Sequence, residues 1–264
     1  YFINLQPSEL MKIAIIVCFA RFFHREQITS VSSFKNIIVS LAILVMPIVL
    51  VVSQPDLGTS ILIAASGLIV LWLAGLNIRY FVYSGLILLV SFPFVISFLK
   101  PYQKLRILSF FNPDRDPLGA GYQIIQSKIA VGSGGLLGKG FLQGTQSYLE
   151  FLPEKHTDFI FTLFSEEQGF IGSVFLLIIY GILIYRIIKI GSISRSYFGR
   201  LFCYGFGSAI FIYIAVNMSM VLGLLPIVGS PLPIMSYGGS SMMAIMLGLG
   251  IAMSCKIYKD TPVN

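Results

Sequence analysis

The chain has 264 residues, of which 56% are hydrophobic and only 11% are charged, and its mean hydropathy is +0.87. Because about 25% of the residues of a typical soluble domain are charged, this composition excludes a soluble globular protein. It predicts an integral membrane protein. The formal net charge of +7 would also suit a nucleic-acid-binding protein, so the basic residues must first be placed relative to the membrane.

Seven stretches are apolar enough to cross a bilayer, whose hydrocarbon core of ~30 Å takes about 20 residues as a helix. Residues 201–255 contain no charged residue and no His, and the stretch LLPIVGSPLPIMSYGGSS divides them into two spans. We therefore expect an all-α polytopic membrane protein, a single membrane domain over 1–264. Its spans are expected near 8–23, 37–53, 57–78, 80–99, 159–186, 201–223 and 238–256.

The Lys and Arg residues are distributed unequally between the segments that join these spans. Ten of them lie in the segments on one side, whereas the short segments on the other side hold Lys12 alone. Since short cytoplasmic loops carry an excess of Lys and Arg, we expect a cytoplasmic C-terminus and an outward-facing loop at 100–158. The positive charge then reflects topology, and we expect no nucleic-acid partner.

The outward loop is expected to contain two short helices, at 101–111 and 121–131. The first has an apolar face suited to lying flat among the membrane lipids, and the second carries Gln123 and Gln126. The stretch GSGGLLGKG that follows lacks the spacing of a phosphate-binding Walker A loop. We interpret it as a flexible, glycine-rich segment.

Charged residues mark the expected outer ends of three spans. Glu9 and Lys12 lie three residues apart, on one side of a helix; they either neutralise each other at the membrane boundary or face a functional cavity. Asp56 is expected to cap the span that follows it. Asp158 either caps a helix starting at Phe159 or takes part in chemistry.

Two further acids lie deeper in the span that follows Asp158. At 1.5 Å per helical residue, Glu166 and Glu167 are ~12–14 Å further along. Acids at that depth line a cavity or pair with a cation.

Five segments resemble those of the SEDS family, whose members include RodA, FtsW and SpoVE. They are QPSELMK, QPDLGTS, NPDRDPLGAGYQIIQSKIAVGSGGLLGKG, GTQSYLEFLPEKHTDFIFTLFSEEQGFIG and PLPIMSYGGSS. They occur in the family's order and cover most of the chain, and GKGFLQGTQS and PEKHTDFIF are more similar to the RodA branch than to FtsW. Family members have about ten spans, so the resemblance implies that the seven here are the last seven, with three N-terminal helices missing.

The resemblance implies a peptidoglycan glycosyltransferase of the bacterial cytoplasmic membrane, active in cell elongation and shape maintenance. Its substrate would be lipid II, a disaccharide-pentapeptide on undecaprenyl diphosphate, polymerised at the outer face. Its partner would be a class B penicillin-binding protein, a transpeptidase. The resemblance makes Asp158 the catalytic residue, and the candidate substrate-binding residues are Glu9, Lys12, Lys104, Arg106, Gln123, Gln126, His156 and Ser240.

One carboxylate is enough for this chemistry. Glycosyl transfer with inversion needs a base for the attacking hydroxyl, whereas a diphosphate leaves readily once its charge is neutralised, unlike the leaving group of a glycosidase. Lys12, Lys104, Arg106 or a divalent cation, Mg²⁺ or Mn²⁺, would neutralise it; no organic cofactor is expected. The alternatives are a lipid II flippase or transporter, a non-catalytic scaffold, and a division or sporulation paralogue.

The orientation can be tested by cysteine labelling of intact cells with a reagent that does not cross membranes. A cysteine introduced at Thr145, in the outward loop, should react, whereas one introduced at Arg195 should not, because the Lys and Arg bias puts 186–200 in the cytoplasm. The reverse labelling pattern would contradict this orientation.

Overall fold

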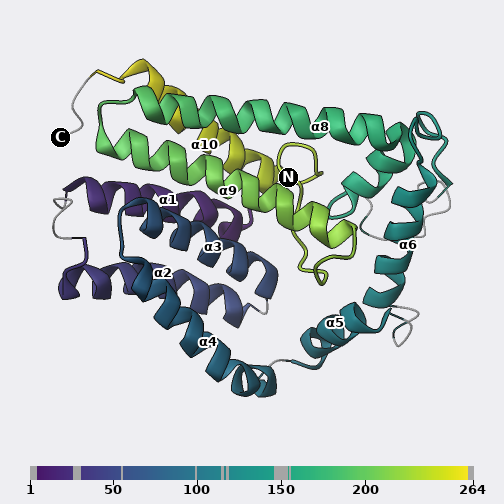
Figure 1. Ribbon diagram of the computed structural model, residues 1–264, viewed down its shortest axis with the longest axis horizontal. Coiled ribbons are helices and arrows are strands. Elements are labelled where there is room, and N and C mark those ends of the chain that lie inside the picture. The colour runs from purple at the N-terminus through teal and green to yellow at the C-terminus, as the bar shows by residue number, and fades with distance from the viewer. Residues whose placement is uncertain are drawn as a thin grey trace. The chain divides into compact units, whose positions relative to one another are not determined.

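The computed structural model describes residues 5–25, 31–54, 56–98, 100–113, 116, 119–145, 154 and 156–260. In this part of the chain all regular secondary structure is helical (Figure 1), which confirms the all-α prediction. The helices are α1 (Pro7–Arg25), α2 (Phe34–Ser53), α3 (Leu57–Leu73), α4 (Ile78–Phe98), α5 (Pro101–Phe111), α6 (Ala120–Ser133), α8 (Ile160–Ile193), α9 (Tyr197–Val221) and α10 (Gly239–Ile257).

A helix lies at each of the seven ranges that were predicted to cross the membrane. Four of the described helices, α2, α8, α9 and α10, are long and apolar enough to do so, while α3 and the first part of α4 are apolar but shorter. The chain is therefore a multi-pass membrane protein. That all seven helices cross the membrane stays a prediction.

The two short helices predicted in the outward loop are also present. Helix α5 covers the first predicted range, and α6 covers the second. Three apolar residues at helical spacing on α5, Leu105, Leu108 and Phe111, are exposed, as expected of a helix that lies at a lipid surface.

The chain forms two compact units. The first comprises Tyr1–Ile78, Tyr180–Ile214 and Tyr237–Asn264, and the second comprises Arg79–Ile179 and Ala215–Ser236. Helices α8 and α9 contribute residues to both. That 1–264 behaves as one domain stays a prediction.

In the first unit, α1 contacts α2, α3 and α10. Phe19 and Phe23 of α1 are fully buried there. Helix α3 begins with Asp56, whose carboxylate accepts a hydrogen bond from the Thr59 amide at 3.0 Å. The predicted capping role of Asp56 is confirmed.

In the second unit, α8 is interrupted at Gly169, which has φ +66° and ψ −164°. The interruption frees two carbonyls and two amides that a continuous helix would pair. The glycine-rich segment after α6 pairs all four. The hydrogen bonds run from Lys139 N to Glu166 O (3.0 Å), Gly140 N to Glu167 O (3.1 Å), Phe170 N to Gly135 O (2.9 Å) and Ile171 N to Leu136 O (3.1 Å).

The interpretation of this glycine-rich segment as flexible is therefore wrong. A Cβ on Gly138, which has φ +79°, would clash with the Glu167 carbonyl oxygen, and a Cβ on Gly169 would clash with the Gly138 amide. The glycines let two backbones approach closely enough to hydrogen-bond. This matters in a membrane helix, because lipid offers no partner for a freed backbone group.

Replacing Gly138 with Ala should destabilise the protein. The left-handed backbone alone costs about 1–3 kcal/mol for a residue with a Cβ, and the clash with Glu167 adds to it. Gly132→Ala is the matched control, because it lies in the same segment of the chain and a Cβ there meets nothing within 4 Å. Thermal unfolding in detergent should show a lower midpoint for the first variant only, and equal midpoints would contradict the docking of this segment.

Candidate functional site

Asp158 lies in the turn that leads into α8, and its side chain is half-buried. Helix α8 begins at Ile160, and the Phe159 carbonyl accepts a hydrogen bond from the Leu163 amide at 3.4 Å. Phe159 therefore occupies the N-cap position. The helix therefore starts one residue later than the predicted start at Phe159. A capping role of the Asp158 carboxylate stays a prediction.

The backbone of Asp158 is held by α9. Asn217, which is fully buried, donates from Nδ2 to the Asp158 carbonyl at 2.8 Å and to the Ser230 carbonyl at 2.6 Å. One amide group thus joins the turn before α8 to the loop after α9.

The same loop holds the neighbouring residue of the turn. The Ser236 hydroxyl donates to the Thr157 carbonyl at 2.6 Å and accepts from the Leu232 amide at 2.7 Å. A Cβ built on Gly229 would lie 3.5 Å from Asp158 Oδ2, so the loop backbone runs beside the carboxylate. Two segments that resemble family motifs, HTDFIF and the start of PLPIMSYGGSS, therefore meet around Asp158.

Helix α6 is anchored to the same part of the second unit. The Ser127 hydroxyl donates to the Val221 carbonyl at 2.7 Å and lies 2.9 Å from the Thr162 hydroxyl. The predicted substrate-binding residues Gln123 and Gln126 are half-buried on this helix.

The other predicted residues of the second unit are more open. Lys104 is half-buried and donates to the Ser97 carbonyl at 3.2 Å. Arg106 is exposed, with its guanidinium 6.0 Å from the centre of the Tyr102 ring, and His156 is exposed. Their roles in substrate binding stay predictions.

The remaining predicted residues, Glu9, Lys12 and Ser240, lie in the first unit. The Lys12 ammonium is 2.7 Å from the Glu9 carboxylate, and both side chains are buried. It also lies 5.3 Å from the centre of the Tyr213 ring. The Ser240 hydroxyl accepts from the Gln6 amide at 2.9 Å. The neutralising ion pair is therefore formed, and its functional role stays a prediction.

Glu166 is fully buried, and its carboxylate lies 2.7 Å from the Lys139 ammonium. The Thr145 hydroxyl donates to the same carboxylate at 3.0 Å. The prediction that a deep acid pairs with a cation is confirmed for Glu166. Its partner comes from the glycine-rich segment, which no helical spacing could have indicated.

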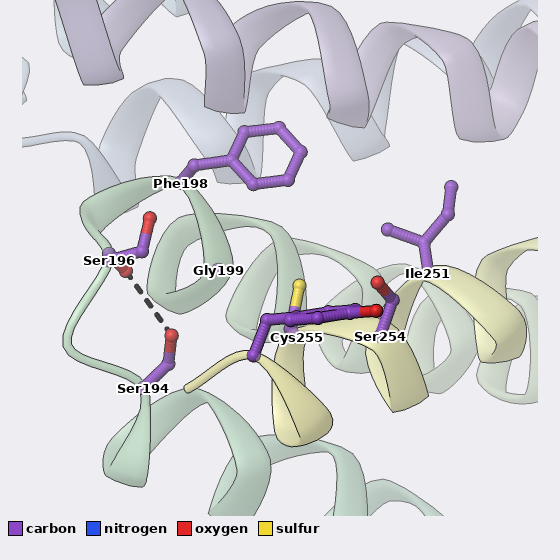
Figure 2. Close-up of a pocket in the computed structure, with 8 residues that line it drawn as sticks. Ser194, Ser196, Phe198, Gly199, Ile251, Ser254 and Cys255 are labelled. Atoms are coloured by element: carbon purple, nitrogen blue, oxygen red, sulfur yellow. Dashed lines mark hydrogen bonds between the residues drawn. The ribbon is translucent and has the colours of Figure 1, made fainter. Parts of the chain in front are cut away.

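A cavity of ≈ 270 Å³ lies in the first unit, between the α8–α9 connection and the end of α10 (Figure 2). Ser194, Phe198, Ser254 and Cys255 contribute to its lining, which includes none of the predicted site residues. The Ser194 hydroxyl is bound to the Ser196 carbonyl at 3.4 Å.

The described residues contain no group of three or more His, Cys, Asp or Glu that could hold a metal ion. They do not fit a resident metal centre. The expected Mg²⁺ or Mn²⁺ ion stays a prediction.

Asn217, Ser236 and Lys139 were not predicted as parts of a site. For Asn217 the sequence does carry a signal, because it is the single Asn or Gln in the uncharged stretch 201–255. Polar side chains inside membrane helices find partners there. Nothing in the sequence indicates which partners.

Comparison with known sequences identifies relatives along nearly the whole chain. The model of the FtsW/RodA/SpoVE family, described as cell cycle protein, matches residues 1–261. The peptidoglycan glycosyltransferase MrdB of Escherichia coli K12 is 48% identical over 258 residues, which are 97% of this chain and 69% of MrdB. Stage V sporulation protein E of Bacillus subtilis 168 is 38% identical over 255 residues, which are 97% of this chain and 69% of that protein.

Solved structures share the fold. One of them comes from a study of the structural coordination of polymerization and crosslinking by a peptidoglycan synthase complex. The alignment covers 98% of this chain and 72% of that chain, with a TM-score of 0.79 and 32% sequence identity. A variant of the Thermus thermophilus rod shape determining protein RodA matches 98% of this chain and 70% of its own length, with a TM-score of 0.67 and 25% identity. This chain belongs to the FtsW/RodA/SpoVE family.

Proposed function

We propose that the chain is a peptidoglycan glycosyltransferase that polymerises lipid II at the outer face of the bacterial cytoplasmic membrane during cell elongation. The observation that carries this proposal is the identity of 48%, over nearly the whole chain, with a peptidoglycan glycosyltransferase. The sporulation relative is less similar, at 38% identity, which favours elongation over a sporulation role. The orientation with a cytoplasmic C-terminus is part of the proposal.

Asp158 acts as the general base. Its carboxylate accepts the proton of the attacking sugar hydroxyl while that oxygen forms a bond to the anomeric carbon of the second substrate. The bond from this carbon to the diphosphate oxygen breaks, and polyprenyl diphosphate leaves with the electron pair. Attack opposite the leaving group inverts the anomeric configuration, and Asp158 then releases its proton to solvent.

The leaving diphosphate needs positive charge nearby. Lys104 and Arg106 suit this role, because they lie on α5, whose exposed apolar side chains are compatible with a position at a lipid surface. Lys12 is less suited, because its ammonium is already bound to Glu9. A Mg²⁺ or Mn²⁺ ion bound to the diphosphate oxygens would supply further charge, and assays with EDTA followed by added metal would measure that requirement.

The flippase alternative loses part of its support. It depends on the two deep acids Glu166 and Glu167, and the Glu166 carboxylate is neutralised by the Lys139 ammonium at 2.7 Å. A buried carboxylate that is already paired offers no free charge to a passing head group.

Replacing Asp158 with Asn should slow polymerisation strongly but not prevent folding. An amide keeps the shape of the side chain and cannot accept the proton, so the rate should fall about 10²–10⁴-fold, the range for a lost general base. The fold should survive, because Asn217 binds the backbone of Asp158 and not its carboxylate. The measurement is glycan product from lipid II per unit of folded full-length protein.

Asp56→Asn is the matched control, because it makes the same change at a helix cap and Asn caps about as well as Asp. It should polymerise lipid II at the wild-type rate. An Asp158→Asn protein that also builds glycan at the wild-type rate would remove Asp158 from the mechanism.

We further propose a class B penicillin-binding protein, a transpeptidase, as the partner that crosslinks the strands. The two aromatic-rich spans, α4 and α9, are the candidate packing surfaces for its membrane helix, and they differ in how far their side chains are exposed. Ile87 and Leu89 of α4 are 69% and 70% exposed, whereas Phe202 and Phe206 of α9 are fully buried. Helix α4 is therefore the better surface.

Purification of the full-length protein from its own membranes in mild detergent should recover a transpeptidase. Charged substitutions at Ile87 and Leu89 should reduce that recovery, because an apolar membrane interface does not accommodate a charge. A transpeptidase that is absent from the wild-type preparation would contradict the partnership, and one that is unaffected by the substitutions would contradict the role of α4.

A further inference from the structure

Asn217 is the most deeply buried amide side chain near the candidate base. It lies in α9, is fully buried, and uses both hydrogens of Nδ2. One goes to the carbonyl of Asp158 and the other to the carbonyl of Ser230, at 2.8 and 2.6 Å. These carbonyls are 59 and 13 residues away along the chain, so the contact is tertiary and not part of α9 itself.

The amide pairs two backbone carbonyls that an apolar side chain would leave without this donor. Among the described residues, Asn217 Oδ1 finds no hydrogen-bond partner although it is buried. The side chain therefore acts here only as a donor, and both of its donated hydrogen bonds end on backbone carbonyls. The two donated hydrogen bonds are what the amide provides that Leu would not.

We propose that Asn217 is a positioning residue for Asp158, which it holds by the backbone so that the carboxylate meets the sugar hydroxyl. The inference rests on the proposed function, in which Asp158 is the general base. Ser236 holds the preceding carbonyl, of Thr157, and the backbone of Gly229 runs beside Asp158 Oδ2. Asn217 and Ser236 together join the turn before α8 to the loop after α9.

Such support matters because Asp158 lies in a turn and not in a helix. A turn residue has no helical hydrogen bonds to fix its own backbone, whereas a general base must stay within about 2.6–3.2 Å of the proton it accepts. A displacement of about 1 Å can lower the rate about 10²-fold. Loss of the Asn217 hydrogen bonds permits a displacement of this kind.

The test measures kcat and KM for lipid II polymerisation by full-length protein carrying Asn217→Leu or Asn217→Asp. Leu removes both donors, and Asp places an acceptor against two carbonyls. In each variant kcat per folded protein should fall about 10²-fold, while KM should stay near the wild-type value. Ser165→Ala is the matched control. It removes a buried hydroxyl in the same unit, one that accepts a hydrogen bond from the Ser173 hydroxyl at 3.1 Å. This variant should leave kcat unchanged.

A double-mutant cycle with Asp158→Asn separates positioning from a general effect on structure. Once the base is gone its position no longer matters, so Asn217→Leu should lower the residual rate little further. Rate losses that multiply in the double variant would overturn the proposal, as would a folded Asn217→Leu protein with wild-type kcat. If the Leu and Asp variants do not fold, Asn217→Ser decides: it keeps one short donor and should give an intermediate kcat, and a wild-type kcat overturns the proposal.

The wild-type protein and Asp158→Asn are measured in parallel. A wild-type protein that makes no glycan, or an Asp158→Asn protein that makes it normally, would refute the proposed function. Failure of the Asn217 inference alone leaves both of those results intact.

Discussion

The structure depends on one constraint: a backbone amide or carbonyl surrounded by lipid has to find its hydrogen-bond partner inside the protein. A regular helix meets this requirement by itself, so every irregularity in an apolar helix needs a second segment. At Gly169 the second segment is the glycine-rich stretch after α6, which pairs the four groups that the interruption of α8 releases. A segment that resembles a linker by composition is thus part of the packing of a helix.

The same constraint shapes the surroundings of Asp158. The turn before α8 exposes carbonyls that no helix pairs, and side chains from α9 and its following loop bind them: Asn217 binds Asp158, and Ser236 binds Thr157. The hydrogen bonds that satisfy these carbonyls therefore also hold the backbone of the candidate base. The three prolines of the loop, at 226, 231 and 233, restrict its backbone further, which favours a single position for the carboxylate beside it.

Buried charge follows a related rule, because an ion that leaves water needs an opposite charge and further hydrogen bonds. Glu9 is paired with Lys12 one helical turn away, and Glu166 is paired with Lys139 from another segment. Asp158 differs from both of these acids in its burial, because its side chain is half-buried.

The sequence by itself determined the membrane class, the positions of the helices, the cap at Asp56 and the family, because composition, hydrophobic length and short motifs are local properties. It also singled out Asp158, through its motif. It did not reveal the docking of the glycine-rich segment against α8, the Lys139–Glu166 ion pair or the hydrogen bond from Asn217 to the Asp158 carbonyl. Each of these joins residues that are 27 to 59 positions apart, and the side-chain pattern of one helix carries no information about which distant carbonyl it will meet. Only the tertiary structure decided those contacts, because they form where helix interruptions and turns leave backbone groups to be paired.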